Sequence, residues 1–302
     1  MSYTLFLGGF DMEEWGRLIT AMVTPFDEHL QVDMRRAVTL GKKLVEEGST
    51  ALVVTGTTGE APTLTSDEKT LLYKVLKEEL DVPIIAGVGT NDTATTIAQA
   101  KAAQAVGVDG LLIVTPYYNK PPQDALYAHF KKIAEAVTTP IMLYNVPGRT
   151  GCNLLPNTVK KLAEIDNIVA LKEASGDIVQ FSEMVKNTPE DFTIYSGDDV
   201  MTLPSLSVGA YGVVSVASHI VGKEMQQMIK AFQEGKVDAA TAIHLSLLGL
   251  YEKLFVIANP IPIKATLKLL GEDVGGVRQP LVNANKEVVE GLKKTLEKLE
   301  LL

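Results

Sequence analysis

The chain is poor in the residues that build cross-links and common metal centres. It has one cysteine, Cys152, in 302 residues, which excludes an intramolecular disulfide and a cysteine-rich metal cluster. The four histidines are scattered and include no HExxH pair, which argues against a zinc hydrolase. A single cysteine is typical of a reducing compartment, and we expect a cytoplasmic protein.

Excess positive charge and long apolar runs are also lacking. The formal charge of -9 and the pI near 5.1 oppose non-specific binding to nucleic acid or to an anionic membrane. Residues 4–10 have no basic leader and are too short for a membrane span. We expect residues 1–15 to be an N-terminal extension, with Met12 as an alternative start. Because the chain is negatively charged overall, binding of an anionic substrate requires a local positive site.

Nucleotide-binding signatures are incomplete. The segment Gly56-Thr57-Thr58-Gly59 is not followed by the Lys-Ser or Lys-Thr pair of a phosphate-binding P-loop. The segment 87–92 lacks the third glycine of a dinucleotide fingerprint. We therefore expect neither ATP nor NAD as a cofactor.

The residues that are present alternate between short β-branched runs and longer helical segments, which is typical of a parallel sheet covered by helices. Eight such units favour a (β/α)8 TIM barrel over residues 16–221. The predicted strands are Leu18–Val23, Ala51–Thr55, Pro83–Val88, Gly110–Thr115, Ile141–Val146, Ile168–Lys172, Phe192–Ser196 and Gly212–Val216.

Two features locate helices. Thr65 and Glu68 have the spacing of a capping box that opens a helix over Lys69–Leu80. After Val221 the strand signals stop, which predicts a C-terminal helical domain over residues 222–302. No Gly/Ser-rich linker precedes this domain, so we expect it to pack tightly on the barrel. Its predicted helices are Lys223–Glu234, Val237–Ile257, Pro262–Leu270 and Asn285–Leu299.

Catalytic groups of such barrels lie at the carboxyl ends of the strands, and Lys172 stands there after the apolar run 168–171. An amine in apolar surroundings has a lowered pKa and is a better nucleophile, as a Schiff-base lysine requires. The alternative is a lysine whose stem lies on the barrel while its head reaches water. Tyr144 ends the preceding strand, where its hydroxyl can point at the Lys172 amine and relay protons, or simply lie in the core.

Two further motifs suit carboxylate binding. The amides and hydroxyls of Gly56-Thr57-Thr58-Gly59 can cradle a carboxylate, although such a segment is also an ordinary turn. Arg149, in a Pro-Gly-Arg turn, can hold a second carboxylate through its planar fork, or lie on the surface. Cys152 has no histidine near it in sequence and is interpreted as a packing residue.

Together these segments resemble the dihydrodipicolinate synthase family from about Gly16 to the C-terminus. The lysine and the glycine-rich motif are shared with the wider class I pyruvate aldolases, which include N-acetylneuraminate lyase. The second threonine, the Tyr-Tyr-Asn segment and the arginine are more specific to the synthase. The segments that carry the resemblance are Gly56-Thr57-Thr58-Gly59-Glu60, Pro116-Tyr117-Tyr118-Asn119, Tyr144-Asn145-Val146-Pro147-Gly148-Arg149-Thr150, Leu171-Lys172-Glu173 and Ser196-Gly197-Asp198-Asp199.

The resemblance implies a lyase of diaminopimelate and lysine biosynthesis in which Lys172 condenses with pyruvate. The resulting enamine attacks L-aspartate-4-semialdehyde, and no cofactor or metal is needed because the imine itself is the electron sink. The resemblance also implies a proton relay of Tyr144, Thr58 and Tyr118. In the family that last tyrosine comes from a neighbouring subunit, so we expect a homotetramer built as a dimer of dimers, or a homodimer.

Substrate-binding roles follow from the same resemblance. Thr57 and Thr58 are expected to hold the pyruvate carboxylate, and Arg149 the semialdehyde carboxylate. Val214 is expected to help position the pyruvate site. Together with Lys172, Arg149 then forms the positive site that an acidic chain needs for anionic substrates.

Many members of the family are inhibited by lysine, which binds through a histidine and a glutamate at the tight-dimer interface. The matching positions here hold Lys69 and Thr95, and Ser66 stands where another histidine is common. A cationic Lys69 repels the ammonium groups of lysine, and Thr95 cannot pair with its α-amine, so we expect insensitivity to lysine. Two other functions stay open: a sugar-acid aldolase on the same scaffold, and a catalytically idle barrel that only binds.

Overall fold

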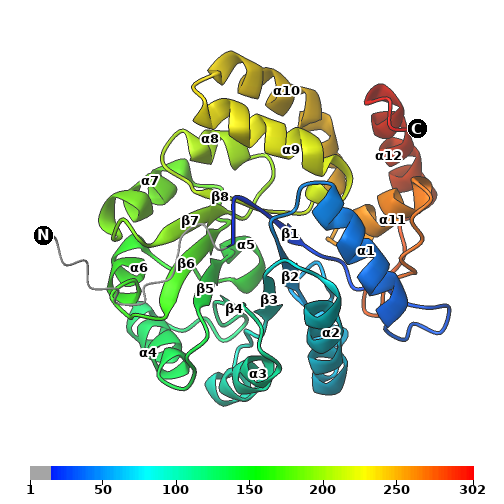
Figure 1. Cartoon of the computed structure of the whole chain (residues 1–302). Helices are drawn as coiled ribbons and strands as arrows, with labels where there is room; N and C mark the ends of the chain where they lie inside the picture. The colour runs from blue at the N-terminus through cyan, green and yellow to red at the C-terminus, as the bar shows by residue number, and fades with distance from the viewer. Residues whose placement is uncertain (1–14) are drawn as a thin grey trace, which may run out of the picture.

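The computed structural model of the protein describes residues 15–302, and these form a closed barrel of eight parallel strands (Figure 1). The strands follow one another in chain order, and the last pairs with the first. The predicted (β/α)8 fold is confirmed. Apart from Trp15, the predicted extension over residues 1–15 lies outside the described residues. The strands are β1 (Leu18–Ala21), β2 (Ala51–Val54), β3 (Ile84–Gly87), β4 (Gly110–Val114), β5 (Ile141–Asn145), β6 (Ile168–Glu173), β7 (Thr193–Ser196) and β8 (Gly212–Ser215).

Most helices surround the barrel, and Figure 1 shows them as an outer ring, with the short helix α5 (Pro147–Thr150) drawn over the middle of the barrel. The predicted capping box is confirmed, because Thr65 accepts from the Glu68 amide while the Glu68 carboxylate accepts from the Thr65 amide. The elements outside the sheet are α1 (Met34–Glu46), η1 (Ala61–Thr63), α2 (Ser66–Glu79), α3 (Thr93–Val106), α4 (Gln123–Ala134), α5 (Pro147–Thr150), α6 (Pro156–Leu162), α7 (Ile178–Asn187), α8 (Thr202–Leu206), α9 (Ser218–Gln233), α10 (Val237–Leu254), α11 (Ile261–Leu269) and α12 (Lys286–Lys298).

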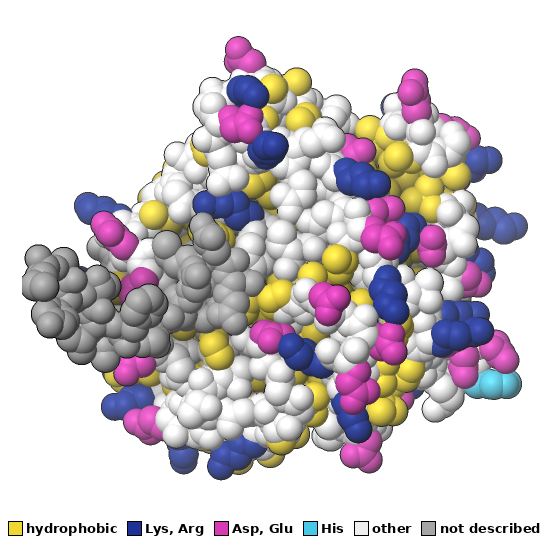
Figure 2. All heavy atoms as spheres, in the orientation of Figure 1, with side chains coloured by type: hydrophobic (Ala, Val, Ile, Leu, Met, Phe, Trp, Pro, Cys, Tyr) yellow, Lys and Arg dark blue, Asp and Glu magenta, His cyan; other side chains and the backbone are white. Residues whose placement is uncertain are grey.

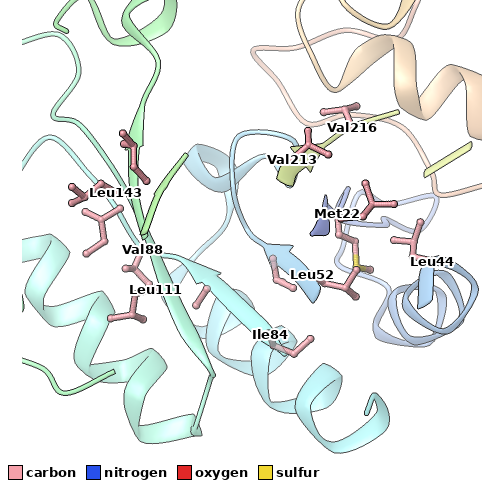
Figure 3. Close-up of a cluster of buried hydrophobic side chains, with 14 of the residues drawn as sticks. Met22, Leu44, Leu52, Ile84, Val88, Leu111, Leu143, Val213 and Val216 are labelled. Carbon is pink, nitrogen blue, oxygen red and sulfur yellow. The ribbon is translucent and has the colours of Figure 1, made fainter. Parts of the chain in front are cut away.

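Both faces of the strands are buried, and successive side chains alternate between them. Figure 3 shows part of the larger cluster, in which Leu52, Leu111 and Leu143 from the strands lie with Leu44 from α1. A smaller cluster, which contains Val53 and Tyr144, fills the inside of the barrel. Because Leu171 belongs to the outer cluster, the next residue, Lys172, points inward.

The C-terminal helices pack directly on the barrel, as predicted. Figure 1 shows α10 beside α9, and α11 and α12 follow beyond them. Helix α9 contacts β1 and α1, which is the place of the eighth barrel helix. The predicted boundary at Val221 falls inside α9, at a residue with non-helical φ and ψ. We therefore propose that the barrel domain extends through α9 and that the C-terminal unit begins at α10.

The molecular surface carries both signs of charge. On the face shown in Figure 2, Lys and Arg side chains are interspersed with Asp and Glu rather than gathered into one region. Within residues 15–302, no helix combines the length and the apolar character that crossing a membrane requires.

Candidate active site

Lys172 and Tyr144 lie side by side inside the barrel. Parallel pairing of β5 and β6 sets them directly opposite each other. The Lys172 Nζ atom lies 4.5 Å from the centre of the Tyr144 ring, and both side chains are buried. The predicted adjacency of these two residues thus follows from strand register.

The Lys172 amine is held without a direct charged partner. Burial lowers the pKa of Lys172 to about 8, although Asp199 and Asp198 attract its proton from a distance. Among residues 15–302, no ion pair or hydrogen bond engages this amine. About a tenth of an amine with this pKa is neutral at pH 7, and its lone pair is free for a carbonyl carbon.

Asp199 forms no ion pair with Lys172 and instead accepts hydrogen bonds from the end of β8. Its carboxylate accepts from Ser215 Oγ at 2.5 Å and from the amides of Val216 and Ala217 at 3.1 and 2.9 Å. Burial raises its pKa to about 6, while these hydrogen bonds oppose the rise. Asp199 therefore fixes the end of β8 beside the cavity, a role that the sequence motif alone does not reveal.

The two threonines of the first motif have different partners. Burial raises the pKa of Tyr144, and the nearby Thr57 side chain opposes this rise. Thr58 accepts a hydrogen bond from Asn259 Nδ2 at 2.8 Å. The sequence-based relay contained Thr58, whereas Thr57 is the threonine that affects the pKa of Tyr144, so the place of Thr58 in the relay stays a prediction. Adjacent residues of a turn point in different directions, and sequence alone does not say which one meets the tyrosine.

A cavity of about 280 Å³ opens above Lys172. Arg149, on the short helix α5, is exposed and lines the cavity together with Tyr144 and both threonines. A second cavity of about 420 Å³ shares Thr57, Tyr144 and Arg149 with the first. This arrangement puts a cationic group at the mouth and a nucleophile at the base of one space.

Two other predicted residues lie away from this space. Tyr118 is 87% exposed and has a φ of +75°, while its amide donates to the Thr150 carbonyl. It is not among the residues that line either cavity. Val214 is buried in the interior cluster, and Val216 is the residue of this segment that lines the cavity. The role of Val214 at the pyruvate site therefore stays a prediction, and its side chain is not part of the cavity lining.

The residues expected at the lysine-inhibition site lie together. Lys69, Ser66 and Thr95 line a pocket of about 260 Å³ between α2 and α3. Burial lowers the pKa of Lys69, whose Nζ atom is 3.4 Å from Gln99 Oε1. Lys69 also lines the second cavity described above.

A buried network that sequence reasoning missed ties the first motif to the C-terminal unit. Glu60, which follows this motif, forms an ion pair with Lys264 of α11 at 2.7 Å. The Arg278 amide donates to the same carboxylate at 2.8 Å, and the Arg278 side chain pairs with Glu68 at 2.6 Å. Charged side chains more than 200 positions apart give no sequence signal of their pairing.

In residues 15–302, no group of three or more His, Cys, Asp or Glu side chains is arranged to hold a metal ion.

Comparisons with known proteins agree on one family. The Dihydrodipicolinate synthetase family matches residues 14–299. The 4-hydroxy-tetrahydrodipicolinate synthase of Heliobacterium modesticaldum is 54% identical over 286 residues, which are 94% of this chain and 95% of that protein. The crystal structure of the Cyanidioschyzon merolae enzyme with lysine bound is 48% identical, with a TM-score of 0.94 over 95% of this chain and 99% of that chain. The dihydrodipicolinate synthase of Bacillus anthracis is 47% identical, with a TM-score of 0.92 over 94% and 98% of the two chains.

Proposed function

The chain belongs to the dihydrodipicolinate synthetase family and is a lyase of the class I aldolase type, and we propose that it condenses pyruvate with L-aspartate-4-semialdehyde on Lys172. This is the 4-hydroxy-tetrahydrodipicolinate synthase reaction, the committing step towards diaminopimelate and lysine. The observation that carries the proposal is the buried Lys172 amine, whose pKa is about 8, beside Tyr144 at the base of a cavity.

The reaction begins when the neutral Lys172 amine attacks the carbonyl carbon of pyruvate. Loss of water gives an imine that is protonated on nitrogen, and the positive charge makes the neighbouring methyl group acidic. Removal of a methyl proton gives the enamine, which forms the new carbon–carbon bond to the aldehyde. The amino group of the product then attacks the imine carbon, closes the ring and releases Lys172.

Tyr144 is the proposed proton donor and acceptor for these steps. Its raised pKa keeps the phenol protonated at neutral pH, and its contact with Thr57 offers a path for the proton. We therefore assign the middle of the relay to Thr57. Thr57 and Thr58 hold the pyruvate carboxylate in this proposal, and Arg149 attracts the semialdehyde carboxylate.

The third member of the relay is Tyr118 of a neighbouring chain, in a homodimer or in a tetramer of two such dimers. The exposure of the Tyr118 side chain supports this assignment, because an aromatic ring in water favours burial against a partner. Mixed dimers test it, formed from Lys172→Ala chains and Tyr118→Phe chains. If the tyrosine crosses, one site of each hybrid is intact and activity returns on mixing. Activity that stays at the level of the separate variants contradicts the exchange.

Insensitivity to lysine is the second part of the proposal. The Cyanidioschyzon merolae relative is described with lysine bound, whereas here the Lys69 amine occupies the pocket of Ser66 and Thr95. Lysine carries two ammonium groups at neutral pH, and a protonated Lys69 repels them. Titration with lysine should leave the rate unchanged into the millimolar range. An inhibition constant below roughly 1 mM contradicts this.

The function is tested by steady-state condensation of pyruvate with aspartate-4-semialdehyde, coupled to dihydrodipicolinate reductase. Turnover that collapses in Lys172→Ala supports both the reaction and its nucleophile. A wild type that is inactive here, yet retains pyruvate on Lys172 after borohydride reduction, indicates an aldolase for another aldehyde, such as a sugar acid. A wild type that fails both assays indicates a barrel that only binds.

A further inference from the structure

Asn259, between α10 and α11, brings the C-terminal unit into the active site. Its side chain is 6% exposed and lines the same cavity as Lys172. The amide nitrogen donates to Thr58 Oγ1 at 2.8 Å, a contact between residues 201 positions apart. The amide oxygen finds no hydrogen-bond donor within residues 15–302. A buried amide with one partner is costly, and such a group often has a functional reason.

The direction of this hydrogen bond determines what Thr58 can do. A hydroxyl group has one hydrogen to donate and two lone pairs that accept. Because one lone pair accepts from Asn259, the hydrogen of Thr58 remains available for a second partner. A carboxylate accepts hydrogen bonds and donates none, so a threonine prepared in this way is matched to a carboxylate.

The same region holds Asn259 in place. Lys264 lies five residues after it, and the buried ion pair of Lys264 with Glu60 joins α11 to the segment that carries Thr58. Lys264 also donates to the Gly276 carbonyl at 2.7 Å. Ties on both sides of the contact leave the amide and the hydroxyl little freedom to separate.

We propose that Asn259 is a positioning residue that orients the Thr58 hydroxyl as a hydrogen-bond donor to the carboxylate of the 2-oxo acid substrate. The inference rests on the proposed function, since it takes pyruvate to be that acid. It divides the work of the two hydroxyl groups: that of Thr57 serves the Tyr144 hydroxyl, and that of Thr58, oriented by Asn259, donates to the substrate carboxylate that both residues hold.

A double-mutant cycle tests this assignment with Asn259→Ala, Thr58→Val and the combined variant. Each is measured for kcat/KM towards pyruvate and, at saturating pyruvate, towards the aldehyde. Asn259→Ala should lower kcat/KM for pyruvate about tenfold, as the loss of one hydrogen bond to a charged group does. The value for the aldehyde should change less than about twofold, since the pyruvate carbons are already bound covalently. In the Thr58→Val background, Asn259→Ala should have little further effect.

Two matched variants separate positioning from general damage. Asn259→Leu keeps the branched shape and the number of heavy atoms of the side chain without its polar groups, and it should show the same loss if Asn259→Ala folds poorly. Thr266→Val removes a buried hydroxyl of α11 that bonds only within its own helix, and it should leave both kcat/KM values unchanged.

Three results overturn the inference in distinguishable ways. An equal loss for Asn259→Ala in wild-type and Thr58→Val backgrounds shows that Asn259 does not act through Thr58. Equal losses towards both substrates show a general disturbance of the site. A wild type that does not retain pyruvate after borohydride reduction overturns the proposed function together with this inference. If the wild type retains pyruvate but the Asn259 and Thr58 substitutions act independently, only the inference is overturned.

Discussion

Two buried lysines in this protein, Lys172 and Lys264, have similar pKa values but different surroundings. Lys172 is 5% exposed and Lys264 is 3% exposed, and burial lowers the pKa of each to about 8. Lys264 forms an ion pair with Glu60 and donates to the Gly276 carbonyl, both at 2.7 Å. Lys172 faces a cavity and the ring of Tyr144.

The difference shows that burial alone does not make a lysine reactive. The hydrogens of Lys264 are committed to fixed oxygen atoms, so losing a proton breaks an ion pair that holds α11 to the barrel. Nothing within residues 15–302 fixes the Lys172 proton in this way, and its lone pair opens onto space for a substrate. The first arrangement stabilises the fold, and the second supports chemistry.

The largest effect should come from Lys172→Ala. Condensation activity should fall at least about 10⁴-fold, as it does when other covalent nucleophiles are removed. Borohydride with pyruvate should label Lys172 in the wild type and leave Lys264 unlabelled, although the two pKa values are alike. Peptide mass spectrometry reads both positions, and substantial label on Lys264 contradicts the comparison.

The next effect concerns stability. Lys264→Met leaves the Glu60 carboxylate buried without its partner, and the free energy of unfolding should fall by about 3–5 kcal/mol. Lys172→Met removes an amine that has no ion pair, so stability should be unchanged or slightly higher. Urea unfolding measures both variants. The pairing account also requires that Glu60→Gln restore part of the stability lost in Lys264→Met.

Tyr144→Phe should have a smaller effect, because it removes only the hydroxyl that is proposed to transfer protons beside Lys172. We expect kcat to fall about 10²-fold, within the usual range for one general acid or base. Thr57→Val should lower kcat more than Thr58→Val does, since Thr57 contacts Tyr144. If Thr58→Val lowers kcat more than Thr57→Val does, Thr58 is the threonine of the proton relay.

The smallest effect is the dependence on pH. In the proposed reaction only the neutral Lys172 amine attacks pyruvate, and its pKa is lowered from 10.5 to about 8 by burial. Below pH 8 the amine is mostly protonated, so kcat/KM for pyruvate should rise about tenfold per pH unit and level off above pH 8. A profile that keeps rising towards pH 10 shows that Lys172 is not acidified. In folded Lys264→Met protein, the pH at which kcat/KM for pyruvate levels off should be unchanged.

Much of the fold was predictable, because its signals are local. The eight apolar runs became eight strands, with ends that moved by one or two residues, and the Thr65 capping box is present. The domain boundary was harder to predict. Strand signals stop near Val221, but α9 still packs on β1 and completes the barrel. Where a helix packs depends on contacts with distant residues, and no local pattern reports these contacts.

By itself, the sequence determined the barrel and the place of its proposed nucleophile. Side chains alternate in strands and catalytic barrels use the strand ends, so Lys172 and Tyr144 were expected to meet inside the barrel. Only the tertiary structure decided that Thr57 lies near enough to affect the pKa of Tyr144, that Asn259 donates to Thr58, and that Lys264 forms an ion pair with Glu60. These contacts depend on side-chain directions and on residues some 200 positions apart, and folding brings them together only when the C-terminal unit packs on the barrel.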